Sequence, residues 1–194
     1  QILFIKYILN SLKSSGRSAI VVPDGVLFDT EFGFTEIRRQ LLDKNLHTII
    51  SLPKGVFEPY SGVKTSVLFF SMVGNTKEIM FINIENDGYK LDSNHDKPIE
   101  LNDIPLACEE YLNRKKNLTE WKKRDKKLVW RKIWCFASLE EIRNNNNDLS
   151  CSKYMPKIQK LNDNSLDQKE ITKSIDNLLN QVNKSFEELK NIIK

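Results

Sequence analysis

The sequence is poor in the residues from which metal and redox sites are usually built. It contains three cysteines and two histidines in 194 residues. Cys108, Cys135 and Cys151 are far apart, and no CxxC pair occurs. Disulfide frameworks use an even number of cysteines, and zinc sites use closely spaced pairs. We therefore expect structural thiols, no disulfides and no metal.

Several short motifs of cofactor and nucleotide sites are also absent. The chain has seven glycines, but none of them forms a GxGxxG or GxxxxGK[ST] pattern, and no HExxH occurs. Dinucleotide-binding, P-loop and zinc-protease functions consequently have no support. His47 begins a predicted strand and His95 lies in a polar segment. For both we expect a structural or solvated role rather than catalysis.

Long hydrophobic runs are missing as well. No segment approaches the roughly 20 apolar residues that a membrane-spanning helix needs. The first twelve residues are apolar, but they contain Lys6 and Asn10 and no small-residue cleavage site follows them. The composition, 40% hydrophobic and 29% charged, is that of a soluble globular protein. We expect a cytoplasmic protein with no membrane contact, and a net charge of +4 does not by itself predict a nucleic-acid partner.

The first half of the chain alternates between helical and strand patterns. Residues 1–12 and 34–44 have apolar side chains at helical spacing. Residues 18–22 form a continuous apolar run, typical of a strand buried on both faces, and residues 46–52 are predicted to form the next strand. Helix, strand, helix, strand is the pattern of an α/β protein with a parallel sheet covered by helices on both sides.

Two further strands are predicted at residues 66–70 and 79–84. The first of them follows residues 46–52 too closely for a helical crossover, so we expect those two strands to be antiparallel. The sheet is thus predicted to be mostly parallel with one antiparallel strand. Because no charged residue protects residues 18–22, we expect them to form a central strand of a sheet that is incomplete in this chain.

The second half is more polar. Residues 93–160 are predicted to be a surface excursion with a basic helical extension, in which lysines and arginines at 114–132 alternate with aromatic residues. This basic stretch suits either DNA phosphates or a solvated helix face, since Glu109, Glu110, Glu120 and Asp125 dilute its charge. The domain boundaries expected are 1–92, 93–160 and 161–194.

The last segment, 161–194, is predicted to be an amphipathic helix. Ser165 and Gln168 form a capping box, and apolar residues then recur at steps of three and four. The resulting apolar stripe could dock on the same protein or contact another subunit. Its residues include Ile171, Ile175, Leu178, Val182 and Leu189.

A loop between two predicted strands carries the strongest functional signal. Residues 55–65, GVFEPYSGVKT, place two aromatic residues, two glycines and a lysine on one short connection. Loops held by a sheet often carry binding residues. Asp24 follows the strand at residues 18–22, at the edge where open α/β sheets bind ligands, although a plain turn role also fits it.

Six segments of the chain resemble a known family in the same order along the sequence. They are GRSAIVVPDGVLF, NLHTIISLPKGVFEPYSGVKTSVLFF, DGYKLD, KPIELNDIP, SLEEI and NDLSCSKYM. Together they resemble the C-terminal half of the modification subunit of type I restriction-modification systems, which are adenine-N6 DNA methyltransferases. The resemblance implies half of a Rossmann-like, S-adenosylmethionine-dependent methyltransferase sheet of seven strands, followed by an α-helical segment.

The resemblance also implies which parts of the methyltransferase are elsewhere. The family's glycine-rich cofactor loop and its Asn-Pro-Pro-Phe (or Tyr) motif precede the matching segment, and neither occurs in this sequence. We therefore expect no catalytic residue here, S-adenosylmethionine only in the complete protein, and no cofactor for this part alone.

Particular residues acquire expected roles from the resemblance. Phe57, with Tyr60 second, is expected to stack on the extruded target base, and Lys64 and Thr65 to contact the DNA backbone. The alternative is that Phe57 packs into the sheet edge and Lys64 is solvated. The implied partners are DNA, the N-terminal half of the methyltransferase, and the specificity and restriction subunits. The stripe at 171–189 is expected to contact the specificity subunit, which reads the DNA sequence.

Three hypotheses remain open from the sequence. In the first, the chain is part of an adenine-N6 methyltransferase and is inactive alone. In the second, it is a non-catalytic assembly module from a split or truncated gene, which associates through the strand at 18–22 or the stripe at 171–193. In the third, it is one piece of a single-chain enzyme that combines restriction and methylation.

Overall fold

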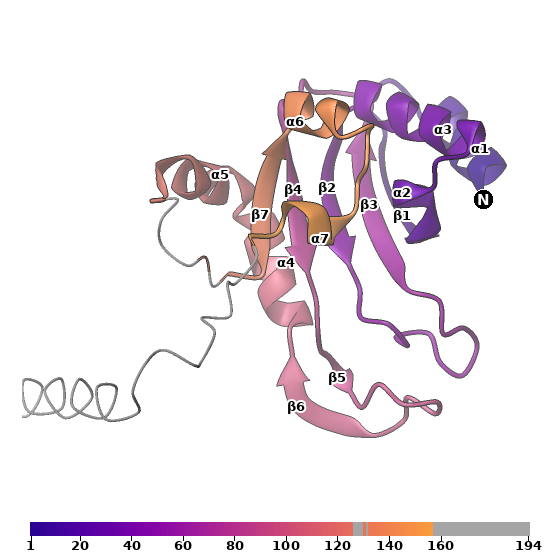
Figure 1. Cartoon of the computed structure of the whole chain (residues 1–194), viewed down its shortest axis with the longest axis vertical. Helices are drawn as coiled ribbons and strands as arrows, with labels where there is room; N and C mark the ends of the chain where they lie inside the picture. Colours follow the sequence, from indigo (N-terminus) through magenta and orange to yellow (C-terminus); the bar gives the residue numbers. More distant parts are fainter. Residues whose placement is uncertain (126–129, 131, 157–194) are drawn as a thin grey trace, which may run out of the picture. The chain divides into compact units, whose positions relative to one another are not determined.

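The structure is a computed structural model, and it describes residues 1–125, 130 and 132–156. Helices and strands alternate over residues 2–51, as the apolar patterns predict, and further strands follow (Figure 1). The elements are α1 (Ile2–Ser11), β1 (Arg17–Pro23), α2 (Gly25–Phe28), α3 (Phe32–Asp43), β2 (Leu46–Ser51), β3 (Thr65–Ser71), β4 (Glu78–Asn83), β5 (Asp87–Tyr89), β6 (Pro98–Asn102), α4 (Ile104–Leu112), α5 (Arg114–Lys123), β7 (Trp134–Ser138), α6 (Leu139–Asn144) and α7 (Cys151–Tyr154).

The main sheet has five strands in the order β1-β3-β2-β4-β7. β3 is antiparallel to both β1 and β2, as expected for the second of these pairs. β2 and β4 are parallel, and β7 is antiparallel to β4. The expectation of a mostly parallel sheet with one antiparallel strand therefore differs from the structure, in which two of the five strands oppose the other three. The chain between β2 and β3 is too short for a helical crossover, so β3 folds back antiparallel to β2, and on its other side it pairs with β1.

β7 is a second difference from the expected organisation. Residues 134–138 were expected within a surface extension, yet they pair with β4 and are almost completely buried. α6 and α7 follow β7 and add Ile142, Cys151 and Tyr154 to the core. Residues 134–154 thus belong to the same compact unit as the first half of the chain, which runs from residue 1 to 157. The boundary expected at residue 92 does not separate a sheet domain from an extension.

β1 was expected to be a central strand of a sheet that is incomplete in this chain, and within the described ranges it lies at one edge of the sheet with one side unpaired. Its side chains alternate, with Ile20 and Val22 buried and Val21 49% exposed. The helices α1 and α3 cover only the face that carries Ile20 and Val22, through Ile5, Leu9, Ile37 and Leu41. An apolar run therefore predicted the strand correctly and its second covered face incorrectly.

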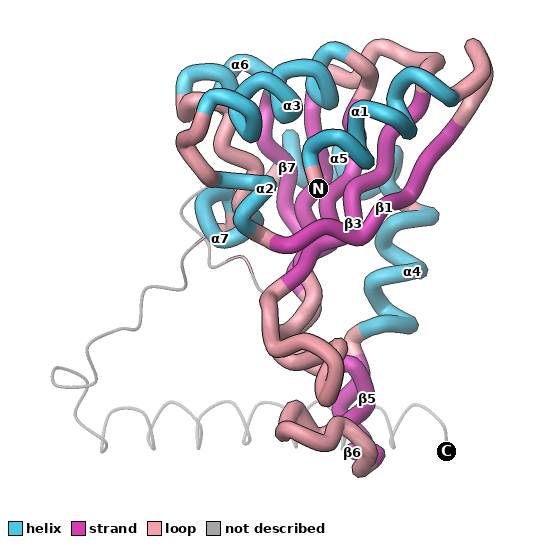
Figure 2. The backbone as a smooth tube through the Cα atoms, turned by 90° about the vertical axis from the view of Figure 1, so that its right-hand side faces the viewer, coloured by secondary structure: helices cyan, strands magenta, loops and turns pink. Residues whose placement is uncertain are grey.

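The two faces of the sheet are covered by different helices. α1, α2, α3, α6 and α7 lie against one face, where the buried core contains Leu68, Phe70 and Phe81. On the other face, α4 and α5 contribute Ala107 and Leu118 to a second apolar cluster. Figure 2 shows α4 on the opposite side of the sheet from α2 and α7. Three tryptophans extend this second cluster in edge-to-face contact, Trp121, Trp130 and Trp134.

A buried arginine joins three segments on the first face. Arg38 on α3 is almost completely buried. Its Nη1 donates to the carbonyl of Val26 at 3.0 Å, and its Nε donates to the carbonyl of Asn147 at 3.0 Å. Burial lowers the pKa of its guanidinium. Because a buried cation is costly unless its donors are satisfied, these bonds fix α2 and the chain after α6 against α3.

Beyond β4 the chain forms a two-stranded hairpin, β5 and β6. His95, which was expected in a polar loop, lies in the turn between these strands with its Nε2 2.8 Å from Oδ2 of Asp87. Asp87 is buried, and the ring of Tyr89 lies 5.4 Å from that of His95. His95 therefore has a structural role in holding this hairpin.

His47 on β2 gives the fold a pH dependence. Its ring centre lies 6.3 Å from that of Tyr111 and 6.5 Å from that of Phe69. Its Nδ1 is 3.0 Å from Oγ1 of Thr48, and its backbone carbonyl accepts a hydrogen bond from Nη1 of Arg114. Burial, and then the charge of Arg114, lowers the pKa of His47 to about 4. In the unfolded chain the pKa of His47 has its ordinary value near 6.5. Between about pH 4 and pH 6.5 the unfolded chain therefore binds a proton that the folded chain does not bind.

We expect His47 to make the chain less stable as the pH falls from about 6.5 toward 4. Allowing for partial exposure, its contribution falls by about 1 kcal/mol between pH 7.5 and pH 5. The measurement is urea unfolding at both pH values for the unchanged chain and for His47→Gln. Carboxylates titrate in both proteins, so the difference between the two slopes isolates His47. Equal slopes would contradict its burial in the neutral form.

In the part of the chain that the structure describes, no helix combines the length and apolarity that crossing a membrane requires. The same residues contain no group of three or more His, Cys, Asp or Glu side chains placed to bind a metal ion. Of the three thiols, Cys135 and Cys151 are buried and Cys108 is exposed. The predicted helix at 161–194, with Ile171, Ile175, Leu178, Val182 and Leu189, lies outside the described residues, as do 126–129 and 131 of the basic stretch.

Candidate functional site

The candidate site lies at the edge of the sheet where β1 and β2 end. Asp24 follows β1, and the loop at residues 52–64 leads from the end of β2 to the start of β3. The pairing of β1 with β3 places Pro23 opposite Thr65, and the N–H of Asp24 donates to the carbonyl of Lys64 at 2.9 Å. Strand register thus brings together two segments that are about forty positions apart in the sequence.

Asp24 forms the centre of a small polar cluster. Its Oδ1 accepts a hydrogen bond from Oγ of Ser66 at 2.7 Å, and its Oδ2 lies 3.8 Å from Nζ of Lys64. The Lys64 side chain is 43% exposed, so this ion pair contributes only about 0 to 1 kcal/mol to stability. Both oxygens of Asp24 are engaged within the chain. Asp24 therefore links the end of β1 to the start of β3.

The loop itself is tightly turned. The carbonyl of Phe57 accepts hydrogen bonds from the N–H groups of Tyr60 and Ser61, both at 2.9 Å. Gly55 has a φ of +90°, a backbone conformation that side chains disfavour. At Gly62 a Cβ atom would lie 2.6 Å from Oε1 of Glu58, so a larger residue would displace that side chain. The two glycines thus allow a compact turn that a chain of bulkier residues would not adopt.

This turn presents two aromatic rings to solvent. Tyr60 is 94% exposed and Phe57 is 40% exposed. Base stacking by Phe57 and its packing at the sheet edge both stay predictions, because a ring that is 40% exposed is partly covered and partly open. Large exposed apolar side chains next to each other on one loop mark a contact surface more often than scattered single ones do. Flat rings at such a position can stack on another flat group.

Thr65 differs from its expected role. It is 7% exposed, and its Oγ1 is buried without a hydrogen-bond partner. A buried hydroxyl does not reach a DNA phosphate, so Thr65 does not offer the backbone contact that was expected beside Lys64. Whether a residue at the start of β3 faces inward depends on strand register, because neighbouring side chains point to opposite faces.

Sequence reasoning missed two serines at this edge. Ser51 and Ser66 are paired across β2 and β3, so they share one face of the sheet. Ser66 holds Asp24, whereas Oγ of Ser51 is buried without a partner. Serines inside apolar strands give no distinct sequence signal, and only the folded chain brings Ser66 to Asp24.

The thiol of Cys151 is not available as a nucleophile at this edge. Cys151 on α7 is affected by the charges of both Lys64 and Asp24, but burial is the main influence and raises the pKa of its thiol to about 12. At neutral pH that thiol is protonated and is a poor nucleophile. The site offers two exposed rings and a partly exposed lysine, which suit binding of a flat, anionic ligand.

Comparisons with known proteins identify the family. The model of the family described as N-6 DNA Methylase matches residues 1–178. The type I restriction enzyme EcoEI methylase subunit of Escherichia coli is 37% identical over 129 residues, which cover 62% of this chain and 26% of that protein. The EcoKI methylase subunit of Escherichia coli strain K12 is 53% identical over 72 residues, which cover 37% of this chain and 13% of that protein.

A solved structure gives the same result in three dimensions. A chain from a structure of a type I R-M system superposes with a TM-score of 0.59 at 28% identity, covering 99% of this chain and 39% of that one. The present chain thus spans about a quarter of the EcoEI subunit and about two fifths of the solved chain. The chain belongs to the N-6 DNA methylase family, and the relatives it matches within that family are methylase subunits of type I restriction enzymes.

Proposed function

We propose that these residues form the target-base side of a DNA adenine-N6 methyltransferase, the modification subunit of a type I restriction-modification system. The observation that carries the proposal is the loop at residues 52–64, which exposes Phe57 and Tyr60 at the edge where β1 and β2 end. An enzyme that modifies a base within duplex DNA must extrude it and then hold it by stacking. A single aromatic ring contributes about 1 to 3 kcal/mol to such binding.

Lys64 supplies the proposed contact with the DNA backbone. Its ammonium group is partly exposed and lies 3.8 Å from Asp24, a weak pairing that a phosphate can replace. Contacts of this kind position DNA without reading its sequence. In this proposal Asp24 keeps Lys64 directed along the edge of the sheet when DNA is absent, and Thr65 has no part in binding.

The residues present do not fit S-adenosylmethionine. Both oxygens of Asp24, the carboxylate at the carboxyl edge of β1, are engaged by Ser66 and Lys64. The sequence contains neither a glycine-rich cofactor loop nor an Asn-Pro-Pro-Phe motif. We therefore assign no step of methyl transfer to these residues. We propose that the cofactor belongs to the complete protein and that the 194 residues alone neither bind it nor methylate DNA.

The proposed partners follow from the same family membership. Within a type I system these residues act in the cytoplasm with the N-terminal half of the methyltransferase, the specificity subunit and the restriction subunit. The specificity subunit reads the DNA sequence, and the predicted apolar stripe at 171–189 is our proposed contact with it.

A second function, a non-catalytic assembly module, has one observation in its favour. The outer edge of β1 has no strand partner in the described part of the chain, and Val21 beside it is half exposed. Open strand edges pair readily with another chain. This module would associate in the same way whether or not a methyltransferase was formed, which separates it from the first proposal.

Cofactor binding and methylation test the proposed function. Calorimetry with S-adenosylmethionine is expected to give no binding heat with the 194-residue chain, and the complete subunit joined to its specificity subunit is expected to methylate adenine. Transfer of a radioactive methyl group to DNA gives the second readout. Micromolar cofactor binding and methyl transfer by the 194 residues alone would contradict the proposal. A complete subunit that assembles but never methylates would favour the assembly module.

A further inference from the structure

A basic groove lies at the other end of the sheet from the aromatic loop. It has a volume of about 760 Å³ and is enclosed by the start of β2, the end of β3, the start of β4 and the junction between α4 and α5. His47 at the start of β2 contributes to it, whereas the loop follows Ser51 at the end of the same strand. The groove also lies on the face of the sheet covered by α4 and α5. It is therefore separate from the candidate site.

The charges around this groove are almost all positive. Five of its lining residues are cations, namely Arg17, Lys77, Arg114, Lys115 and Lys116, and Glu78 is the one carboxylate among them. Glu78 is already engaged, because its Oε1 lies 2.5 Å from Nζ of Lys122. Within the described residues, no carboxylate lies at ion-pair distance from any of the five cations. A pocket with uncompensated charge of one sign attracts ligands of the opposite sign.

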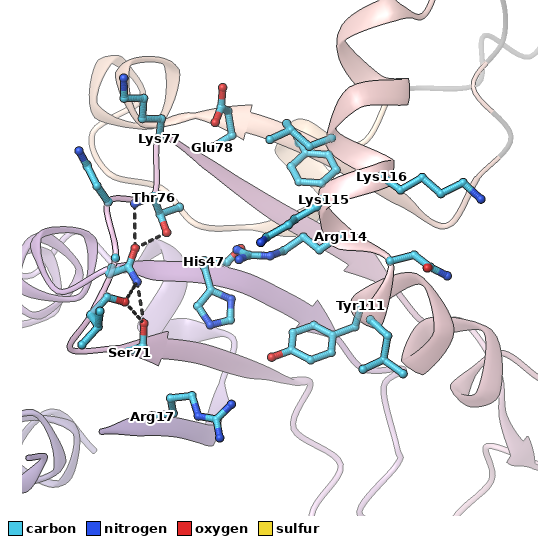
Figure 3. Close-up of a pocket in the computed structure, with 18 residues that line it drawn as sticks. Arg17, His47, Ser71, Thr76, Lys77, Glu78, Tyr111, Arg114, Lys115 and Lys116 are labelled. Carbon is cyan, nitrogen blue, oxygen red and sulfur yellow. Dashed lines mark hydrogen bonds between the residues drawn. The ribbon is translucent and has the colours of Figure 1, made fainter. Parts of the chain in front are cut away.

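One wall of the groove combines this charge with flat rings. Figure 3 shows the side chains of His47, Tyr111 and Arg114 close together in the groove, with Arg17 coming from β1. The ring planes of His47 and Tyr111 are inclined by 28°, and Tyr111 also contacts Phe69 at 4.8 Å between ring centres. Arg114 begins α5, whose first turn contains no acidic residue, so the positive end of that helix adds to the charge.

We propose that this groove binds the sugar–phosphate backbone of a DNA strand, as a contact additional to the aromatic loop. The five cations suit phosphates, and the rings of Tyr111 and His47 suit a base or sugar, which an acidic peptide does not provide. The groove is of the size that takes a nucleotide-sized group. The proposal goes beyond the proposed function and shares with it only DNA as the ligand.

DNA binding by matched lysine variants tests this groove. The probe is a fluorescein-labelled oligonucleotide, single-stranded or duplex, and anisotropy is measured from 50 to 200 mM salt with the full 194-residue chain. Lys115→Gln with Lys116→Gln removes two charges from the groove, whereas Lys6→Gln with Lys13→Gln removes two exposed charges elsewhere. We expect the groove variant to bind about tenfold more weakly and to lose about 1.4 to 1.8 from the salt slope. The control pair is expected to bind nearly as the unchanged chain does.

Four outcomes would overturn the proposal. Equal losses in both double variants would mean that binding depends on total charge only, and no loss in either would place DNA elsewhere. Displacement of DNA from the groove by polyglutamate at equal charge concentration would indicate an acidic protein partner. Binding of ATP that is as tight as DNA binding, and is lost with Lys115 and Lys116, would indicate a free nucleotide. Phe57→Ala is expected to leave the salt slope unchanged, so failure of the groove and failure of the loop give different results.

Discussion

Replacing Phe57 with alanine is expected to lower adenine methylation by the complete subunit about 5- to 150-fold. That range corresponds to the loss of one base–aromatic stack, about 1 to 3 kcal/mol. Phe57 is 40% exposed and lies on a loop outside the hydrophobic core, so the stability of the fold should change little. The measurement is the rate of methyl transfer under single-turnover conditions, together with the urea midpoint of each variant.

Two further variants make the assignment of the ring specific. Phe57→Trp keeps a flat aromatic surface and is expected to retain most of the rate. Tyr60→Ala removes the neighbouring ring, which is almost fully exposed, and is expected to have the smaller effect. A normal rate in Phe57→Ala with a large loss in Tyr60→Ala would assign the stack to Tyr60. Normal rates in both would remove the loop from base binding.

Replacing Phe81 with alanine is expected to destabilise the chain by about 3 to 5 kcal/mol, the usual cost of a large cavity in a core. Phe81 lies in β4 with no exposed surface, and its ring stacks on that of Tyr154 with 4.7 Å between centres. It is also paired with Ile49 of β2 and Cys135 of β7. One side chain thus joins the first half of the chain to β7 and α7, which the sequence had placed in separate parts.

Urea unfolding measures this effect, and Phe32→Ala provides the matched control. Phe32 is 85% exposed at the start of α3, so its removal is expected to change stability by no more than about 0.5 kcal/mol. A loss below 1 kcal/mol in Phe81→Ala would mean that β7 and α7 do not pack on β4 in solution. The two variants make the same chemical change, one at a fully buried position and one at an exposed position.

The sequence predicted local elements better than their pairing. Apolar runs identified β1 to β4, and the short connection at 52–64 correctly gave an antiparallel β2 and β3. The insertion of β3 between β1 and β2 has no local signal, because it depends on contacts between residues some 50 positions apart. β7 was missed because its short apolar run follows a basic, tryptophan-containing stretch that also suits a helix.

The site was predicted only in part, because some of its contacts join residues that are far apart in the sequence. A loop with two aromatics, two glycines and a lysine is evident in the sequence, and the structure exposes both rings. The burial of Thr65 follows from strand register, which the pattern of one strand does not fix. The bond from Ser66 to Asp24 and the basic groove join residues from distant segments. Such groupings exist only after folding.

The position of β3 also affects the order in which the chain becomes structured during synthesis. β1 and β2 leave the ribosome before β3, yet β3 is the strand that pairs with both of them. Until residue 71 has emerged, neither strand has its partner from this hairpin, and each presents unpaired backbone groups that favour association with other chains. The last of the three strands to be made is therefore the one that covers an edge of each of the other two.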